Sequence, residues 1–359
     1  MSDICIRRVG KAGRITLQRP DALNALTYDM ALSIEAALLA WRDDADVAFV
    51  IIDAEGERAF CSGGDIQEMY RTGTAGDFDY GRRFWADEYR LNALIAAYPK
   101  PYVALMHGFT MGGGVGVSAH GSHRIVCESS QIAMPECGIG LVPDVGGSLL
   151  LANGPGRVGE YLGLTGARMD AGDAIFVGFA DIFVPQVAWP SLIRSLEQAV
   201  DRSAVDAAIG AVAAPAPVSK LAAERDLIDR YFSGESLRDI VNLLTHTAET
   251  GAADGDWAAA ALKKLSRPSP LSMGCAVELI HRARMLGDVP RTLAQEYRFT
   301  YRCMEHGDFL EGIRAQVIDK DRSPRWRHER LDTVGAMEVS KMLLPLGHAE
   351  LRLAGEGME

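Results

Sequence analysis

The sequence lacks the features that would place a protein outside the cell or in a membrane. Its six cysteines show no CxxC pair and no His and Cys spacing typical of a zinc site, so we expect reduced thiols and no metal. No uninterrupted apolar stretch is long enough to span a bilayer, and residues 1–8 lack the apolar run of a signal peptide. We therefore expect a cytoplasmic protein with no membrane partner.

The sequence also has fewer positively charged than negatively charged residues. The chain has 37 Lys and Arg against 48 Asp and Glu, which gives a formal net charge of −11. A field of that sign repels phosphates, so nucleic acid is not an expected partner. The 359 residues, 48% of them hydrophobic, are enough for a sizeable core without disulfides or metals. That length suggests two domains, or one large domain with an appendage.

Short β-branched runs alternate with helical patterns in the first half of the chain. Residues 14–17 have the pattern of a strand, and Thr27 is the predicted N-cap of the helix that follows. Residues 47–52 and 101–106 are apolar runs that suit buried strands. This alternation predicts an α/β layer architecture.

From about Trp189 onward the strand-like runs give way to alanine-rich amphipathic patterns. Residues 211–217 and 251–255 have the composition of loops between helices. A last helical section is predicted from near Pro270 to beyond Gly307. We therefore expect a core domain over residues 1–190 and a helical C-terminal region over residues 191–359.

Three glycine-rich segments, residues 60–66, 107–116 and 134–147, are candidates for contact with a ligand. Glycine between a strand and a helix leaves backbone N–H groups exposed at the positive end of the helix. Two such amides, one from each of the first two segments, could form an oxyanion hole for a thioester carbonyl. The alternative is that these segments are flexible loops. No GxGxxG follows a strand, so a dinucleotide site is not supported.

Glu136 and Asp144 are the acids of interest, because each follows a proline in an apolar, glycine-rich stretch. Buried acids in such surroundings have raised pKa values that suit nucleophilic or acid and base catalysis. The alternative places Glu136 in the first turn of a helix and makes Asp144 the N-cap ahead of Gly146. Cys137 could be a nucleophile, but no partner histidine is evident.

Together these segments resemble the crotonase (enoyl-CoA hydratase/isomerase) superfamily, and most closely its 3-hydroxyisobutyryl-CoA hydrolase branch. The resemblance is carried by residues 100–105, 111–116 and 134–147, and near the C-terminus by residues 308–315, 318–321 and 323–326. It implies an α/β fold of the crotonase (ClpP-like) type, a spiral of ββα units, followed by a helical C-terminal region. It also implies a homo-oligomer, because relatives commonly form trimers or hexamers.

The resemblance assigns roles to residues of the first two segments. The amides of Gly64 and Gly113 would form the oxyanion hole. The adenine and pantetheine of coenzyme A would lie against the backbone around Ser62, Gly64 and Ile66. Glu88, on the helix before the second segment, would lie near the substrate. Coenzyme A is part of that substrate, and no separate cofactor is implied.

The third segment separates hydrolysis from hydration. Hydratases of this superfamily hold water between two glutamates, of which one matches Glu136 and the other falls at Gly116, which has no side chain. Asp144 stands where those hydratases usually carry glycine. The resemblance therefore implies that Glu136 and Asp144 hydrolyse a short 3-hydroxyacyl-CoA, 3-hydroxyisobutyryl-CoA of valine breakdown above all. The alternatives are an enoyl-CoA hydratase or isomerase with Glu136 as base, and a non-catalytic acyl-CoA binding protein.

Overall fold

The structure is a computed structural model that describes residues 2–353. Contacts divide the chain into two compact units whose segments alternate along the sequence. The first, called the sheet unit, contains Met1–Asp65, Asp87–Ala133 and Arg168–Lys220. The second, called the helical unit, contains Ile66–Ala86, Met134–Ala167 and Leu221–Glu359. The domains expected over 1–190 and 191–359 stay a prediction.

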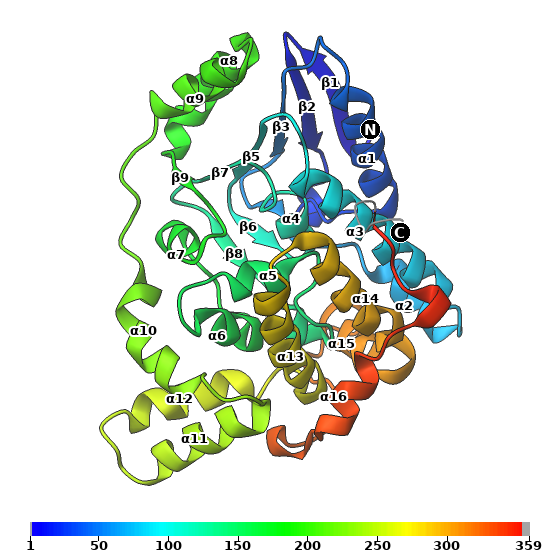
Figure 1. Cartoon of the computed structure of the whole chain (residues 1–359), viewed down its shortest axis with the longest axis vertical. Helices are drawn as coiled ribbons and strands as arrows, with labels where there is room; N and C mark the ends of the chain where they lie inside the picture. The colour runs from blue at the N-terminus through cyan, green and yellow to red at the C-terminus, as the bar shows by residue number, and fades with distance from the viewer. Residues whose placement is uncertain (1, 354–359) are drawn as a thin grey trace. The chain divides into compact units, whose positions relative to one another are not determined.

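The strands of the described residues all lie in the sheet unit (Figure 1). The larger sheet has the order β1-β2-β3-β5-β7-β9 and the smaller one β4-β6-β8. Apart from the antiparallel pair β1 and β2, neighbouring strands run parallel. The strands are β1 (Ile4–Val9), β2 (Ala12–Leu17), β3 (Phe49–Ala54), β4 (Ala59–Cys61), β5 (Tyr102–Met106), β6 (Phe109–Met111), β7 (His123–Val126), β8 (Gln131–Ala133) and β9 (Ile182–Phe183).

From β3 to β9, consecutive strands alternate between the two sheets. Strands β3, β5 and β7 join the larger sheet, whereas β4, β6 and β8, which follow them in the chain, join the smaller one. Each repeat thus contributes one strand to each sheet, which confirms the predicted spiral of ββα units. The strands predicted at 14–17, 47–52 and 101–106 correspond to β2, β3 and β5.

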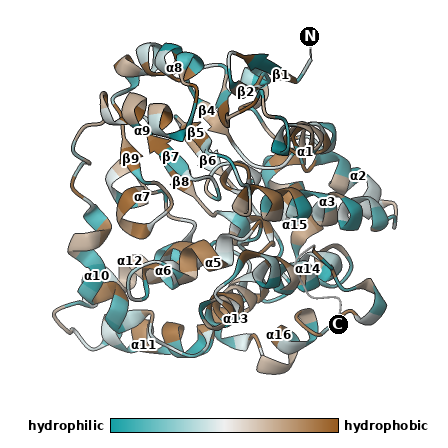
Figure 2. Ribbon diagram, turned by 45° about the horizontal axis from the view of Figure 1, so that its top comes forward, coloured by the Kyte–Doolittle hydropathy of each residue, from teal (hydrophilic) through white to brown (hydrophobic). Residues whose placement is uncertain are grey.

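Helices α8 and α9 cover one face of the larger sheet. Trp189, Leu192 and Leu196 of α8 belong to one buried cluster with Phe49 of β3 and Val103 of β5. Hydrophobic colouring marks the central strands in Figure 2. Thr27 caps the first helix as predicted, because its side chain accepts from Met30 N at 3.2 Å. The helices of this unit are α1 (Tyr28–Arg42), the second part of α3 (Asp79–Ala96), α4 (Gly113–Gly116), α7 (Ala171–Val177), α8 (Trp189–Gln198) and α9 (Arg202–Gly210), with short 3-10 turns η1 (Pro20–Ala22) and η3 (Gln186–Ala188).

The helical unit has no strand among its described residues, which confirms the predicted helical character of the C-terminal region. Helix α13 packs against α5, α6 and α14 (Figure 1). None of the helices that the structure describes is long and apolar enough to cross a membrane. The elements are α2 (Gln67–Thr74), the first part of α3, η2 (Glu136–Ile139), α5 (Gly147–Ala152), α6 (Val158–Thr165), α10 (Lys220–Tyr231), α11 (Leu237–Glu249), α12 (Gly255–Leu265), α13 (Pro270–Leu286), α14 (Val289–His306), α15 (Phe309–Ile313), η4 (Arg314–Ile318), η5 (Leu331–Thr333), α16 (Ala336–Met342) and η6 (Gly347–Ala349).

Candidate active site

The segment after β4 lies alongside the turn that precedes α1. Leu26 N donates to Gly63 O at 2.8 Å, and Asp65 N donates to Leu26 O at 2.8 Å. These two bonds use the backbone groups on either side of Gly64, which forms an isolated parallel bridge with Leu26. Ser62 N is fixed in the same way, by donation to Leu23 O at 3.0 Å. The first predicted amide is therefore held by neighbouring backbone within the sheet unit.

Gly113 lies beside Gly64 and Glu88. It is the first residue of α4, so its amide has no acceptor within the helix. A Cβ added to Gly113 would lie 3.3 Å from Gly64 N and 2.7 Å from Glu88 Oε1. Glu88 itself is 3% exposed. The structure thus brings together three residues that the sequence predicted, which we call the amide cluster: Gly64, Gly113 and Glu88.

The glycine run that carries Gly113 packs against the end of β4. A Cβ at Gly114 would lie 2.4 Å from Cys61 O, so this position has no room for a side chain. Ser118 Oγ donates to Gly114 O at 2.6 Å and is fully buried, so this serine packs within the helical turn. Burial raises the pKa of Cys61 to about 12, so its thiol stays protonated. Of the predicted coenzyme A contacts, Ser62 belongs to the sheet unit and Ile66 to the helical unit.

Glu136 is the first residue of the short 3-10 helix η2, and it is 5% exposed. Two glycines let the C-terminal part of the helical unit approach this turn. A Cβ at Gly140 would lie 2.5 Å from Asp308 O, and a Cβ at Gly312 would lie 2.1 Å from Ile139 O. The helical turn expected for Glu136 is therefore present, and it is held by contacts between backbones far apart in the sequence.

Ser269 fastens the same turn from the start of α13. Its amide donates to Cys137 O at 2.9 Å, and its hydroxyl donates to Asp308 Oδ2 at 2.6 Å. Burial, and then the charge of Glu136, raise the pKa of Cys137 well above its usual value. A protonated thiol is a poor nucleophile, so the structure does not support Cys137 in that role.

Asp144 opens a tight turn ahead of α5. Gly147 N donates to Asp144 O at 2.6 Å, while Val145 and Gly146 have φ values of 54° and 81°. Two consecutive positive φ values are characteristic of a type I′ turn. The N-cap of α5 is Gly146, so the alternative in which Asp144 is the N-cap is wrong. Asp144 itself is buried, at 4% exposed.

Glu296 of α14 contacts the turn that Asp144 opens, and it was not predicted from the sequence. It is fully buried and accepts from Gly146 N at 2.8 Å, from Ser148 N at 3.0 Å and from Ser148 Oγ. The acceptor that an N-cap side chain would supply therefore comes from a helix 150 residues further along. Its neighbours Leu293 and Phe299 are buried, but no local pattern in the sequence links Glu296 to a turn 150 residues away.

Residues 311–325, near the C-terminus, fold around Arg314. Arg314 binds both carboxylate oxygens of Glu311, at 2.7 and 2.9 Å, and also Asp319 and Asp321, each at 2.7 Å. Glu311 in turn accepts from Arg325 N at 2.7 Å. These contacts order the chain just after Gly312. The residues that carry the resemblance near the C-terminus therefore support the turn of Glu136.

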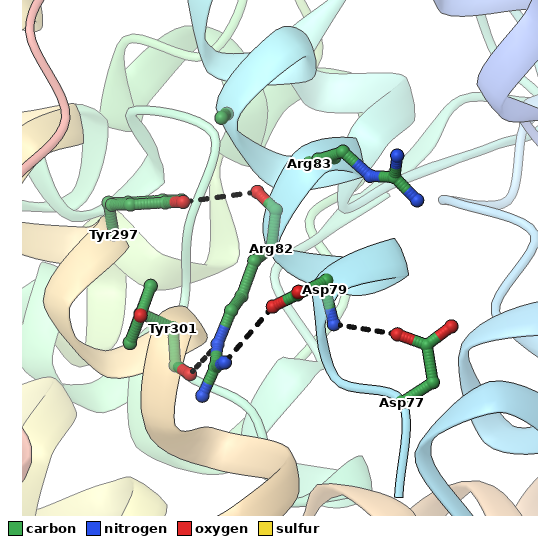
Figure 3. A pocket seen from close by; sticks show the side chains of 7 residues that line it. Asp77, Asp79, Arg82, Arg83, Tyr297 and Tyr301 are labelled. Carbon is green, nitrogen blue, oxygen red and sulfur yellow. Dashed lines mark hydrogen bonds and ion pairs between the residues drawn. The ribbon is translucent and has the colours of Figure 1, made fainter. Parts of the chain in front are cut away.

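A pocket of about 410 Å³ in the helical unit contains none of the predicted residues (Figure 3). Its central guanidinium, that of Arg82, lies 4.0 Å from the ring centre of Tyr301 and donates to Tyr301 O at 3.1 Å and to Asp79 at 3.2 Å. Arg82 and Asp79 are thus paired with each other, and the lining defines no single class of ligand. The lining residues are Asp77, Asp79, Arg82, Arg83, Ala86, Tyr297 and Tyr301. Within residues 2–353 no group of His, Cys, Asp and Glu is arranged to hold a metal ion.

The chain has close relatives along nearly its whole length. A zebrafish (Danio rerio) protein named mitochondrial 3-hydroxyisobutyryl-CoA hydrolase is 40% identical, over 98% of this chain and 92% of its own. The Arabidopsis thaliana protein named 3-hydroxyisobutyryl-CoA hydrolase 1 is 37% identical, over 92% of this chain and 88% of its own.

Solved structures agree on the fold. A structure described as an enoyl-CoA hydratase from Rhodobacter sphaeroides is 54% identical, with a TM-score of 0.90 over 98% of this chain and 100% of its own. A carnitinyl-CoA dehydratase from Mycobacterium thermoresistibile is 39% identical, with a TM-score of 0.91 over 99% of this chain and 100% of its own. A family model described as enoyl-CoA hydratase/isomerase matches residues 12–343. With that match and these identities, the chain belongs to the enoyl-CoA hydratase/isomerase family.

Proposed function

We propose that the protein hydrolyses a short 3-hydroxyacyl-CoA, with 3-hydroxyisobutyryl-CoA as the preferred substrate and 3-hydroxyisobutyrate and coenzyme A as products. Near full-length similarity to proteins named 3-hydroxyisobutyryl-CoA hydrolase supports this choice. The observation that carries it is Asp144, a buried acid in a type I′ turn, at the place where hydratases of the superfamily usually carry glycine. Together with the buried Glu136, it supplies the two carboxyls that hydrolysis uses.

The amide cluster would bind the thioester oxygen. We assign to Gly64 N and Gly113 N the role of donating to that oxygen, where negative charge grows as the carbonyl is attacked. One such donor is typically worth about 3–4 kcal/mol of barrier. Glu88 would contact the acyl part of the substrate, because its carboxylate lies within a side chain's reach of Gly113.

Glu136 would carry out the attack. In the covalent route a Glu136 oxygen bonds to the thioester carbon, the C–S bond breaks, and coenzyme A leaves as a thiolate. Water then hydrolyses the resulting anhydride and restores the carboxylate. In the direct route Glu136 takes a proton from the attacking water. In both routes Asp144 orients water or the substrate hydroxyl, and the good leaving group removes the need for a strong general acid.

Hydration of an enoyl-CoA is the second candidate, because the solved relatives are described as an enoyl-CoA hydratase and a carnitinyl-CoA dehydratase. Gly116 opposes it, since a second glutamate would fall at that buried position of α4. Incubation with crotonyl-CoA separates the two activities. Loss of enoyl absorbance without release of free thiol would favour hydration.

The expected setting of the reaction follows from the same family membership. The acyl-CoA is the small-molecule partner, and we propose that coenzyme A enters only as part of that substrate. A homo-oligomer, a trimer or hexamer as in relatives, is proposed as the assembly. A cytoplasmic location remains our proposal from the sequence, whereas the zebrafish relative is named as mitochondrial.

The test is release of free thiol from 3-hydroxyisobutyryl-CoA by the wild type and by Glu136→Gln. We expect the variant to lose at least about 10³-fold in kcat, because the attacking or proton-accepting oxygen is replaced by an amide. Cys137→Ala is the matched control, since it alters the neighbouring buried side chain and should keep most of the activity. Unchanged thiol release by Glu136→Gln would remove Glu136 from the mechanism.

A further inference from the structure

The turn that carries Asp144 is under conformational strain. Val145 has φ of 54°, a region in which β-branched residues are rare, and it is buried. At the end of the turn, Gly147 packs against a side chain: a Cβ added to it would lie 2.4 Å from Met134 Cε. Such a turn persists only where surrounding contacts hold it.

Glu296 supplies those contacts. Its Oε2 accepts from Gly146 N, and its Oε1 accepts from both the amide and the hydroxyl of Ser148. Three donors thus converge on one buried carboxyl group from the turn and the first residues of α5. The group thus fixes Gly146 and Ser148, the residues on either side of Gly147, and holds the turn that Asp144 opens.

A carboxyl is a costly way to cap a helix at this place. Among the described residues no Lys or Arg forms an ion pair with the fully buried Glu296. A serine or aspartate at the N-cap itself would satisfy the amide of Ser148 locally. Burial of an acid without a cationic partner is disfavoured, so its presence calls for a role beyond capping.

We propose that Glu296 is a positioning residue for Asp144 in thioester hydrolysis. The inference rests on the proposed function, because it needs Asp144 to take part in the reaction. Glutamine does not replace this group, since its single oxygen can meet the donors on one side only. Its NH₂ would then face either Gly146 N–H or the donors of Ser148, donor against donor. The turn would shift, and Asp144 with it.

Electrostatics adds a readout that a purely structural role would not give. Burial raises the pKa of Glu296 to about 8 against the hydrogen bonds from Ser148 and Gly146, and the charge of Asp144 adds to the rise. Ionisation of Glu296 would therefore place a second negative charge near Asp144. The charges of Asp144 and Arg82 also act on Cys303 of the same helix. Burial, however, raises the pKa of that thiol well above its usual value. We therefore expect Glu296 to titrate near pH 8.

The experiment compares Glu296→Gln with the wild type on 3-hydroxyisobutyryl-CoA. We expect kcat to fall about 100-fold, as a misplaced catalytic group would cause, with KM changed less than about threefold. The inflection of kcat near pH 8 should disappear with the ionisable group. Ser148→Ala, which removes a single donor, should lower kcat about threefold to tenfold and decides the matter if Glu296→Gln does not fold.

Glu160→Gln is the matched control, because Glu160 is an equally buried acid of the helical unit that binds Arg157 and Arg284. It should lower Tm and leave kcat and the pH profile unchanged. The inference is overturned if Glu296→Gln lowers Tm alone, or if Ser148→Ala keeps the wild-type kcat. Asp144→Asn tests the proposed function separately: full activity in that variant would refute the role of Asp144 whatever Glu296→Gln does.

Discussion

The amide cluster and the acid segment, residues 134–147, are built in different ways. Gly64 is held by backbone bonds to Leu26, and Gly113 starts a helix two residues after β6. The acid segment depends on distant parts of the chain, because Asp308, Gly312 and Glu296 fix the turns of Glu136 and Asp144. Glycines next to strands can position a backbone amide unaided, whereas a buried carboxyl needs partners that only the folded chain provides.

Of the two substitutions Gly113→Ala and Gly312→Ala, Gly113→Ala should have the larger effect on activity. The new Cβ would lie 2.7 Å from Glu88 Oε1 and 3.3 Å from Gly64 N, so it would occupy the space assigned to the thioester oxygen. We expect kcat to fall about 10²–10³-fold, as on loss of an oxyanion donor, with little change in Tm. Thiol release and thermal unfolding measure the two quantities. Gly210→Ala, a helical glycine of the same unit with open space around it, is the control.

Gly312→Ala should act on stability first. Its Cβ would lie 2.1 Å from Ile139 O, and neither backbone can yield without moving the turn of Glu136. We expect the free energy of unfolding to fall by about 2–4 kcal/mol, with a loss of about tenfold in kcat. Denaturant unfolding and thiol release on the same samples would show this. If Gly312→Ala and Gly113→Ala gave the same ratio of activity loss to stability loss, the contrast between the two regions would be wrong.

The difference between the regions also explains what the sequence could predict. The buried strands β3 and β5 and the Thr27 cap follow from short-range patterns, and the structure confirms them. Strand β1 was missed because its residues, including Arg7 and Arg8, are mostly half-buried and lack an apolar run. Gly64, Gly113 and Glu88 were predicted as site residues, and the structure brings them together.

The supports of the acid segment were out of reach of local reasoning. The alternative in which Asp144 is the N-cap assumed that capping groups lie near their helix in the sequence. In the structure the acceptor is Glu296, 150 residues away from Gly146. The alternation of the two units along the chain is equally invisible in composition, since it depends on which segments pack together.

The smallest expected effect is on the pH dependence of stability. It sets Glu160 against Glu296, two buried acids that both lie in the helical unit. Burial opposes ionisation of Glu160, but bonds from His281, Arg284 and Arg157 outweigh it and lower its pKa to about 2. The contribution of Glu160 to stability is present above its ordinary pKa of 4.5 and is lost as the pH falls toward 2. The pKa of Glu296 is raised to about 8, so Glu296 behaves in the opposite way. Its contribution to stability is complete below pH 4.5 and is lost as the pH rises through 8.

Thermal unfolding of the wild type, Glu160→Gln and Glu296→Gln between pH 3 and 9 would separate these two contributions. Each titrating proton changes the free energy of unfolding by at most about 1.4 kcal/mol per pH unit. Glu160→Gln should flatten the acid side of the curve only, and Glu296→Gln the alkaline side only. A Glu296→Gln curve parallel to the wild type above pH 6 would mean that Glu296 is already ionised in the native protein. In that case the three converging hydrogen bonds outweigh burial, and Glu296 is ionised throughout the neutral range.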